Sequence, residues 1–143
     1  MSVDKPMTTL LVNIDVDDLD RAIRFYTGAF DLRIGRRFGD AGVELVGANA
    51  AIYLLVKQAD RPPFPGSTSP RSYARHWTPV HLDFVVEDLD GALARAEAAG
   101  AVREGDVAVH AWGRIVLLAD PFGHGLCLIQ FSERGYDAVA TNS

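Results

Sequence analysis

Two similar stretches, VDDLDRAIRF at residues 16–25 and VEDLDGALAR at residues 86–95, decide the fold of this chain. They are separated by an offset of 70 residues and share five identical positions. An apolar segment precedes each stretch, and an apolar helical pattern continues from it. Fixed-period similarity of this kind indicates that one supersecondary unit is repeated. The sequence therefore predicts an internal duplication.

Each copy carries the signals of a helix that begins at an aspartate. Asp18 and Asp88 stand where an N-cap side chain accepts hydrogen bonds from the free amides of the first turn. The apolar residues that follow have the i, i+3, i+4, i+7 spacing of a one-faced helix: Leu19, Ala22, Ile23, Tyr26 and Phe30 in the first copy, and Leu89, Ala92, Leu93 and Ala96 in the second. Gly100 suits the C′ position that ends the second helix. Both aspartates are therefore interpreted as caps and not as catalytic carboxylates.

Short apolar stretches surround both helices and predict strands. One precedes each helix, at residues 9–16 and 80–86, and three follow it, at 32–38, 43–47 and 50–58 in the first copy and at 101–110, 112–119 and 125–131 in the second. Each half therefore reads as a βαβββ module. We expect one domain over residues 1–143, made of a module at 8–58, a proline-rich linker at 59–78, a module at 79–131 and a short C-terminal tail.

A module this small cannot cover both faces of its own sheet. We therefore expect an α+β fold in which the two modules form one curved, eight-stranded sheet, with the helices outside and a cavity on the concave side. The sequence leaves open whether the modules pair within one chain or are exchanged between two chains.

Alternation along the strands assigns side chains to the cavity. In the first strand, Ile14 and Val16 belong to the helix-facing set. The inward set, from the first, fifth and last strands, comprises Leu11, Asn13, Asp15, His81, Asp83 and Cys127.

Further candidates are aromatic or cationic side chains, because small-molecule pockets combine apolar walls with a few polar groups. They are Tyr53, Trp77 from the linker, Trp112 and Arg114. His81 and Asp83 could form an imidazole–carboxylate pair for acid–base chemistry. Cys127 is better explained as a small buried apolar residue than as a nucleophile.

Composition excludes several partners. The chain has 143 residues and a formal net charge of −5, which argues against binding to nucleic acid. Its longest apolar run is far shorter than the roughly 20 residues that cross a membrane. A single cysteine excludes a disulfide framework within the chain and predicts a cytoplasmic location. Residues 1–9 lack the apolar segment of a secretion signal.

Three segments together resemble the vicinal oxygen chelate superfamily, which includes glyoxalase I, extradiol dioxygenases, fosfomycin-resistance enzymes and bleomycin-resistance proteins. They are VNIDVDDLDRAIRFY at 12–26, VHLDFVVEDLDGALARAEAAGA at 80–101 and WGRIVLLADPFGHGLCLIQF at 112–131. The resemblance implies the paired βαβββ fold and a homodimer. It does not by itself imply one activity, because this fold hosts several chemistries.

In metal-dependent members, the resemblance implies one ligand from each of four strands, a His or Gln, a Glu, a His and a Glu. The matching positions here are Leu11, Tyr53, His81 and Cys127, so only His81 has the expected type. A catalytic zinc site usually has three protein ligands. We therefore expect no metal and no other cofactor. The inward residues Asp15, Asp83 and Asn13 leave open a metal site at a relocated position.

The resulting expectation is metal-free binding, or sequestration, of a small aromatic or amphipathic molecule in the concave cavity, as in the bleomycin-resistance branch. Two enzymatic alternatives stay open. One is a metal-dependent lyase, isomerase or dioxygenase of the glyoxalase type. The other is a metal-free acid–base enzyme that uses His81 and Asp83.

Overall fold

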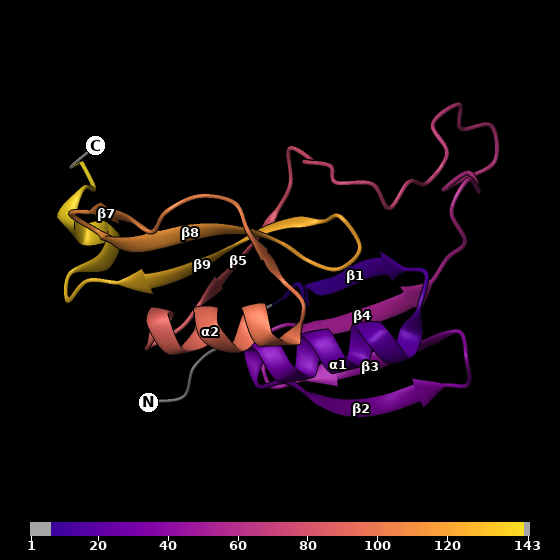
Figure 1. Cartoon of the computed structure of the whole chain (residues 1–143), viewed down its shortest axis with the longest axis horizontal. Coiled ribbons are helices and arrows are strands. Elements are labelled where there is room, and N and C mark those ends of the chain that lie inside the picture. Colours follow the sequence, from indigo (N-terminus) through magenta and orange to yellow (C-terminus); the bar gives the residue numbers. More distant parts are fainter. Residues whose placement is uncertain (1–6, 142–143) are drawn as a thin grey trace.

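Each half of the chain folds into a sheet that carries one helix on one face (Figure 1). The computed structural model describes residues 7–141. The first module contains β1 (Leu11–Val16), α1 (Leu19–Phe30), β2 (Arg33–Phe38), β3 (Gly42–Val46) and β4 (Ala51–Val56). The second contains β5 (Leu82–Val85), α2 (Leu89–Ala99), β6 (Val102–Arg103), β7 (Ala108–His110), β8 (Gly113–Ala119) and β9 (Gly125–Phe131). A 3-10 helix, η1, follows at Gly135–Ala138.

The two sheets have the same topology. The first has the order β1–β4–β3–β2 and the second β5–β9–β8–β6, with β7 also paired to β8. In each module the strand before the helix pairs in parallel with the last strand, and the other pairs are antiparallel. The duplication, the α+β class and the βαβββ modules are therefore confirmed.

The predicted helix caps are present. Asp18 Oδ1 accepts a hydrogen bond from the amide of Arg21 at 3.0 Å, and Asp88 Oδ1 accepts one from the amide of Gly91 at 3.1 Å. Both aspartates have extended backbone, as N-cap residues do. The local sequence thus determined where both helices begin.

The second module differs from the first in one strand. The strand expected over 101–110 is divided into β6 and β7, so residues 7–141 contain nine strands instead of eight. Gly105, between them, has φ +131°, which is incompatible with a continuous strand. Both parts still pair with β8, so the order of the sheet is preserved.

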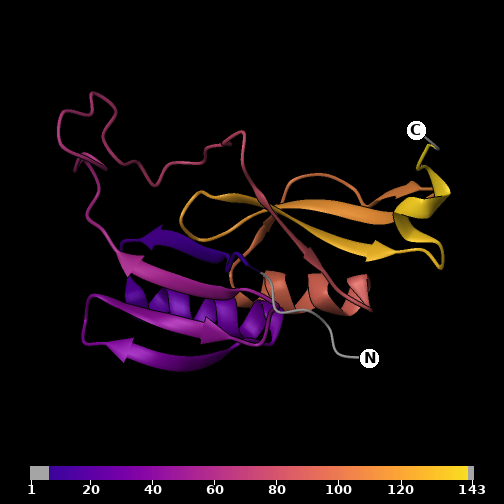
Figure 2. The ribbon, with the colours of Figure 1, turned by 180° about the vertical axis from the view of Figure 1, so that it is seen from behind.

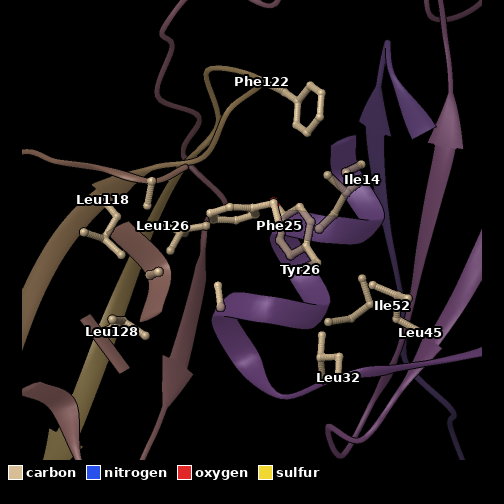
Figure 3. Close-up of a cluster of buried hydrophobic side chains, with 14 of the residues drawn as sticks. Ile14, Phe25, Tyr26, Leu32, Leu45, Ile52, Leu118, Phe122, Leu126 and Leu128 are labelled. Carbon is tan, nitrogen blue, oxygen red and sulfur yellow. The ribbon is translucent and has the colours of Figure 1, made fainter. Parts of the chain in front are cut away.

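Both modules contribute to one hydrophobic core around α1 (Figure 3). Phe25 points from α1 towards Leu126 of the second sheet, while Ile52 of the first sheet lies on the other side of the helix. Close to the C-terminal end of α1, the Phe30 ring stacks on the Phe84 ring of β5 at 3.8 Å. The helices α1 and α2 lie side by side (Figures 1 and 2). The two modules are thus joined by their helix-side surfaces.

The strand edges of β1 and β5 do not pair with each other in the part of the chain described here, so there are two sheets and not one continuous sheet. Instead, residues of both strands line two cavities, and Leu10, Val12 and Leu82 line both of them. The cavities therefore lie where the two modules meet.

The linker leaves the end of β4 and runs as an extended loop to the start of β5 (Figure 2). Side chains attach it to both modules. Arg71 Nε lies 2.7 Å from Asp15 Oδ2 of β1, and Arg75 Nε lies 2.7 Å from Glu104 Oε2 beyond β6. Neither of the described helices α1 and α2 is long and apolar enough to cross a membrane.

Candidate functional site

The alternation predicted for β1 holds. Ile14 and Val16 are buried on the side of α1, whereas Leu11 on the opposite face is 52% exposed. The parallel pairing of β5 with β9 sets Asp83 beside Cys127 on the equivalent face of the second sheet. The predicted inward residues therefore lie on the faces opposite the helices.

A cavity of about 530 Å³ brings several predicted residues together. Its lining includes Leu11, Asn13 and Asp15 of β1, His76, Thr78 and His81 from the segment before β5, and His124 from the β8–β9 turn. A second cavity, of about 620 Å³, is lined by Asp83, Phe84 and Val85 together with Ala48 and Ile52 of the first module. Both volumes fall within the range of small-molecule sites.

His81, Asp83 and Cys127 form a cluster at the junction of the two cavities. Their ligand-type atoms all lie within 4.8 Å of one another, and His81 Nε2 is 3.2 Å from Asp83 Oδ1. Burial and the neighbouring Asp83 carboxylate raise the pKa of the Cys127 thiol to about 11. The thiol is therefore protonated at neutral pH, which disfavours Cys127 as a nucleophile.

Trp77 completes the surroundings of His81. Its ring lies 4.5 Å from the His81 ring, and it covers Gly125 at the start of β9. A Cβ atom at Gly125 would collide with the Trp77 ring, so the glycine is needed for this packing. The linker tryptophan thus contacts His81, although it lines neither cavity.

Sequence reasoning missed a hydrogen-bonded histidine pair beside the same cavity. His124 Nδ1 is 3.0 Å from His76 Nε2, and His124 Nε2 is 2.7 Å from the carbonyl oxygen of Asp15. His76 Nδ1 lies 3.0 Å from the carbonyl oxygen of Ala74. The pair connects the linker, the β8–β9 turn and β1. These residues are far apart in sequence, so no local signal indicated the contact.

A second missed group lies on the open face of the first sheet. Glu44 of β3 accepts hydrogen bonds from Arg36 Nε at 3.1 Å, Arg36 Nη2 at 2.8 Å and the Tyr53 hydroxyl at 3.0 Å. The hydrogen bonds from Arg36 lower the pKa of Glu44 to about 2. Alternation could have placed Glu44 on this face, because Val43 and Leu45 beside it are buried against α1.

Three predicted residues lie away from the cavities. Tyr53 faces the open side of the first sheet but is bound to Glu44. The Trp112 ring stacks on His110 at 5.0 Å and packs near Tyr136 of η1, so it anchors the far end of the second sheet. The prediction that Arg114 lines the cavity was wrong. Arg114 lies on the helix-facing side of β8 with Val116 and donates a hydrogen bond to Asp90 of α2 at 2.8 Å.

The four ligand positions implied by the superfamily resemblance do not make its metal centre here. Leu11 offers no donor atom, and the Tyr53 hydroxyl is engaged with Glu44 and Arg36. Only His81 and Cys127 retain donor atoms at these positions, and both belong to the second module. The first module therefore supplies neither of its two expected ligands.

Comparison with known proteins agrees with the fold. The family model described as "Glyoxalase-like domain" matches residues 11–129. The antibiotic-binding protein TnmS3 from Streptomyces sp. CB03234 is 23% identical, with a TM-score of 0.62 over 92% of this chain and 99% of that one. The fosfomycin-resistance protein FosX from Listeria monocytogenes is 16% identical, with a TM-score of 0.67 over 91% of this chain and 95% of that one.

A lactoylglutathione lyase from Agrobacterium tumefaciens is 20% identical, with a TM-score of 0.58 over 89% of this chain and 96% of that one. No sequence among the curated proteins matches significantly. At these identities the solved structures establish the fold, and the family model establishes the family. The chain belongs to the glyoxalase-like domain family, within the vicinal oxygen chelate superfamily.

Proposed function

We propose that this protein binds, and thereby sequesters, a small aromatic or amphipathic molecule between its two modules, through apolar contacts that need no metal. The observation that carries this proposal is the pair of cavities between β1 and β5, whose shared lining residues Leu10, Val12 and Leu82 are apolar. Ligand pockets typically combine such walls with a few convergent polar groups.

The exposure of apolar side chains around the cavities supports the same proposal. Leu11 is 52% exposed and Val85 is 55% exposed, and each lines one cavity. A ligand that covered them would remove apolar surface from water, worth about 25 cal/mol per Å². The polar lining residues Asn13 and His76 would orient the ligand. The antibiotic-binding neighbour TnmS3 has the same fold, which supports this proposal.

A fluorescent probe tests the site. Anilinonaphthalene sulfonate, an aromatic molecule with one charged group, is titrated into the full chain. We expect Leu11→Glu to weaken binding by about tenfold or more, because it buries a charge against an apolar ligand. Val102→Glu is the matched control, since Val102 is 61% exposed on β6 and lines neither cavity. Equal affinities of wild type and Leu11→Glu would show that the cavities are not the binding site.

Native mass spectrometry of the freshly purified chain tests sequestration itself. A co-purified organic molecule that denaturation releases unchanged would support binding without turnover. A molecule that the protein converts on incubation would contradict it. The same spectrum counts subunits, so it also tests the homodimer, which stays a prediction.

A metal-free acid–base enzyme is the second candidate, because His81 Nε2 lies 3.2 Å from Asp83 Oδ1. A carboxylate at this distance can orient an imidazole for proton transfer. If the recovered molecule is converted, the pH–rate profile should lose one limb in Asp83→Asn. An unchanged profile in that variant would exclude this mechanism.

A further inference from the structure

Three different donor side chains converge on one face of β5 and β9. His81 directly precedes β5, and Asp83 lies two residues later on the same face of that strand. Asp83 is in register with Cys127 across the parallel pair. Hydrogen-bonded strands hold the Cα positions of Asp83 and Cys127. His81 stands one residue before β5, next to Leu82, which pairs with Leu126 of β9.

The separations fit a small tetrahedral ion. Bonds of about 2.0–2.1 Å to nitrogen and oxygen and about 2.3 Å to sulfur place the donor atoms of a zinc site about 3.4–3.7 Å apart. His81 Nε2 and Asp83 Oδ1 are 3.2 Å apart, and no pair in the cluster exceeds 4.8 Å. The donor atoms thus already lie close to the separations that a zinc ion sets between its ligands.

The donor types also select among ions. One imidazole, one carboxylate and one thiolate carry a total charge of −2, which balances a divalent cation. Thiolate and imidazole favour zinc, whereas magnesium and manganese favour sites rich in oxygen donors. With only one carboxylate, this cluster is a poor site for the latter two ions.

We propose that His81, Asp83 and Cys127 form a zinc site that lies wholly within the second module. On binding, the Cys127 thiol releases its proton to solvent, and the sulfur, the imidazole nitrogen and one carboxylate oxygen bond to the ion. This ligand set differs from the one that the superfamily resemblance implies, because it includes no ligand from the first module and adds Asp83. It also departs from the expectation of no metal, and it uses Asp83, one of the residues that left a relocated site open.

The surroundings leave a fourth position open. About a third of the His81 and Asp83 side chains is exposed, and each residue lines one of the two cavities. Three protein ligands with one open position are typical of zinc sites that bind a further molecule. The proposed sequestration does not require this ion, so either proposal can fail without the other.

Zinc titration of the tag-free, metal-stripped full chain tests the site. Trp77, 4.5 Å from the His81 ring, provides a fluorescence signal in addition to calorimetry. We expect one zinc ion per chain, bound at least about 100-fold more tightly than magnesium or manganese. Loss of a side chain that only hydrogen-bonds to a metal ligand already lowers metal affinity by about 10–100-fold. Cys127→Ser and Asp83→Asn change ligands themselves, so each should weaken zinc binding by about 100-fold. Cobalt provides a second readout, a thiolate-to-cobalt absorption band that Cys127→Ser abolishes.

His110→Gln is the matched control, because His110 is an exposed histidine of the same sheet, stacked on Trp112 away from the cluster. Its zinc affinity should equal that of the wild type. The proposal is overturned if zinc does not bind with a stoichiometry of one, if Cys127→Ser binds zinc as tightly as the wild type, or if cobalt gives no thiolate band. Circular dichroism of each variant confirms that the fold is retained, and the near-isosteric Cys127→Ser is the variant best suited to retain it.

Discussion

The hydrogen bond between Tyr26 and Asp120 gives the sharpest test of how the two modules are held together. The Tyr26 hydroxyl, on α1, donates to Asp120 Oδ2 at 2.5 Å. Both residues are buried, with 1% and 3% of their surfaces exposed. The other oxygen of Asp120 accepts the amides of Phe122 at 2.8 Å and His124 at 2.9 Å, which shapes the β8–β9 turn. One side chain thus connects the first helix to the turn that bears His124.

Tyr26→Phe removes only the hydroxyl. The ring and its apolar contacts remain, so the change in hydrophobic burial is small. A hydrogen bond to a charged group contributes about 1.5–3 kcal/mol, and its loss leaves a buried carboxylate oxygen without this partner. We therefore expect the free energy of unfolding to fall by about 1.5–3 kcal/mol. Urea denaturation followed by circular dichroism measures this difference directly.

Tyr73→Phe is the control for Tyr26→Phe. The Tyr73 hydroxyl also donates across the fold, to the carbonyl oxygen of Lys57 at 2.6 Å, but its acceptor is neutral and the site is open to water. Removing the Tyr73 hydroxyl should lower the free energy of unfolding by no more than about 1.5 kcal/mol. In an Asp120→Asn background the effect of Tyr26→Phe should shrink, because the charged acceptor is gone. A loss below about 0.5 kcal/mol for Tyr26→Phe, or one equal to that of Tyr73→Phe, would refute the reasoning.

Three further predictions concern the linker, the first sheet and Trp77. His124→Ala should speed tryptic cleavage within residues 59–78, because it removes hydrogen bonds that attach the linker; unchanged cleavage would contradict this. The pKa of Glu44 is about 2 when folded, against a usual 4.5, so its stabilisation is present above pH 4.5 and lost as the pH falls towards 2. Acid titration of Glu44→Gln should lack that loss of stability. Gly125→Ala should displace Trp77 and shift its emission to the red, whereas an unshifted spectrum would show that the ring is not packed there.

The sequence by itself determined the modules, both helix starts and the inward faces of β1, β5 and β9. These features depend on interactions within a few residues. An aspartate caps its own helix, as Asp18 and Asp88 do, and alternation along one strand separates the face on the helix from the open face. The candidate residues His81, Asp83 and Cys127 were found for the same reason.

Alternation cannot assign the faces of a strand that is apolar on both sides. In β8, Ile115 and Leu117 alternate with Val116 and Leu118, so the pattern does not say which set faces α2. Pairing with β9 decided it, and Arg114 therefore lies with Val116 on the helix side. The register between strands is a tertiary property, and a shift of one residue would exchange the two faces.

Contacts between distant segments were decided only by the tertiary structure. His76 and His124 are 48 residues apart, and Tyr26 and Asp120 are 94 residues apart. The meeting of β1 and β5, which forms both cavities, depends on how the two modules pack through their helices. No periodicity encodes such a contact, because the free energy that forms it comes from burying the faces of complete elements and not from any one stretch of chain.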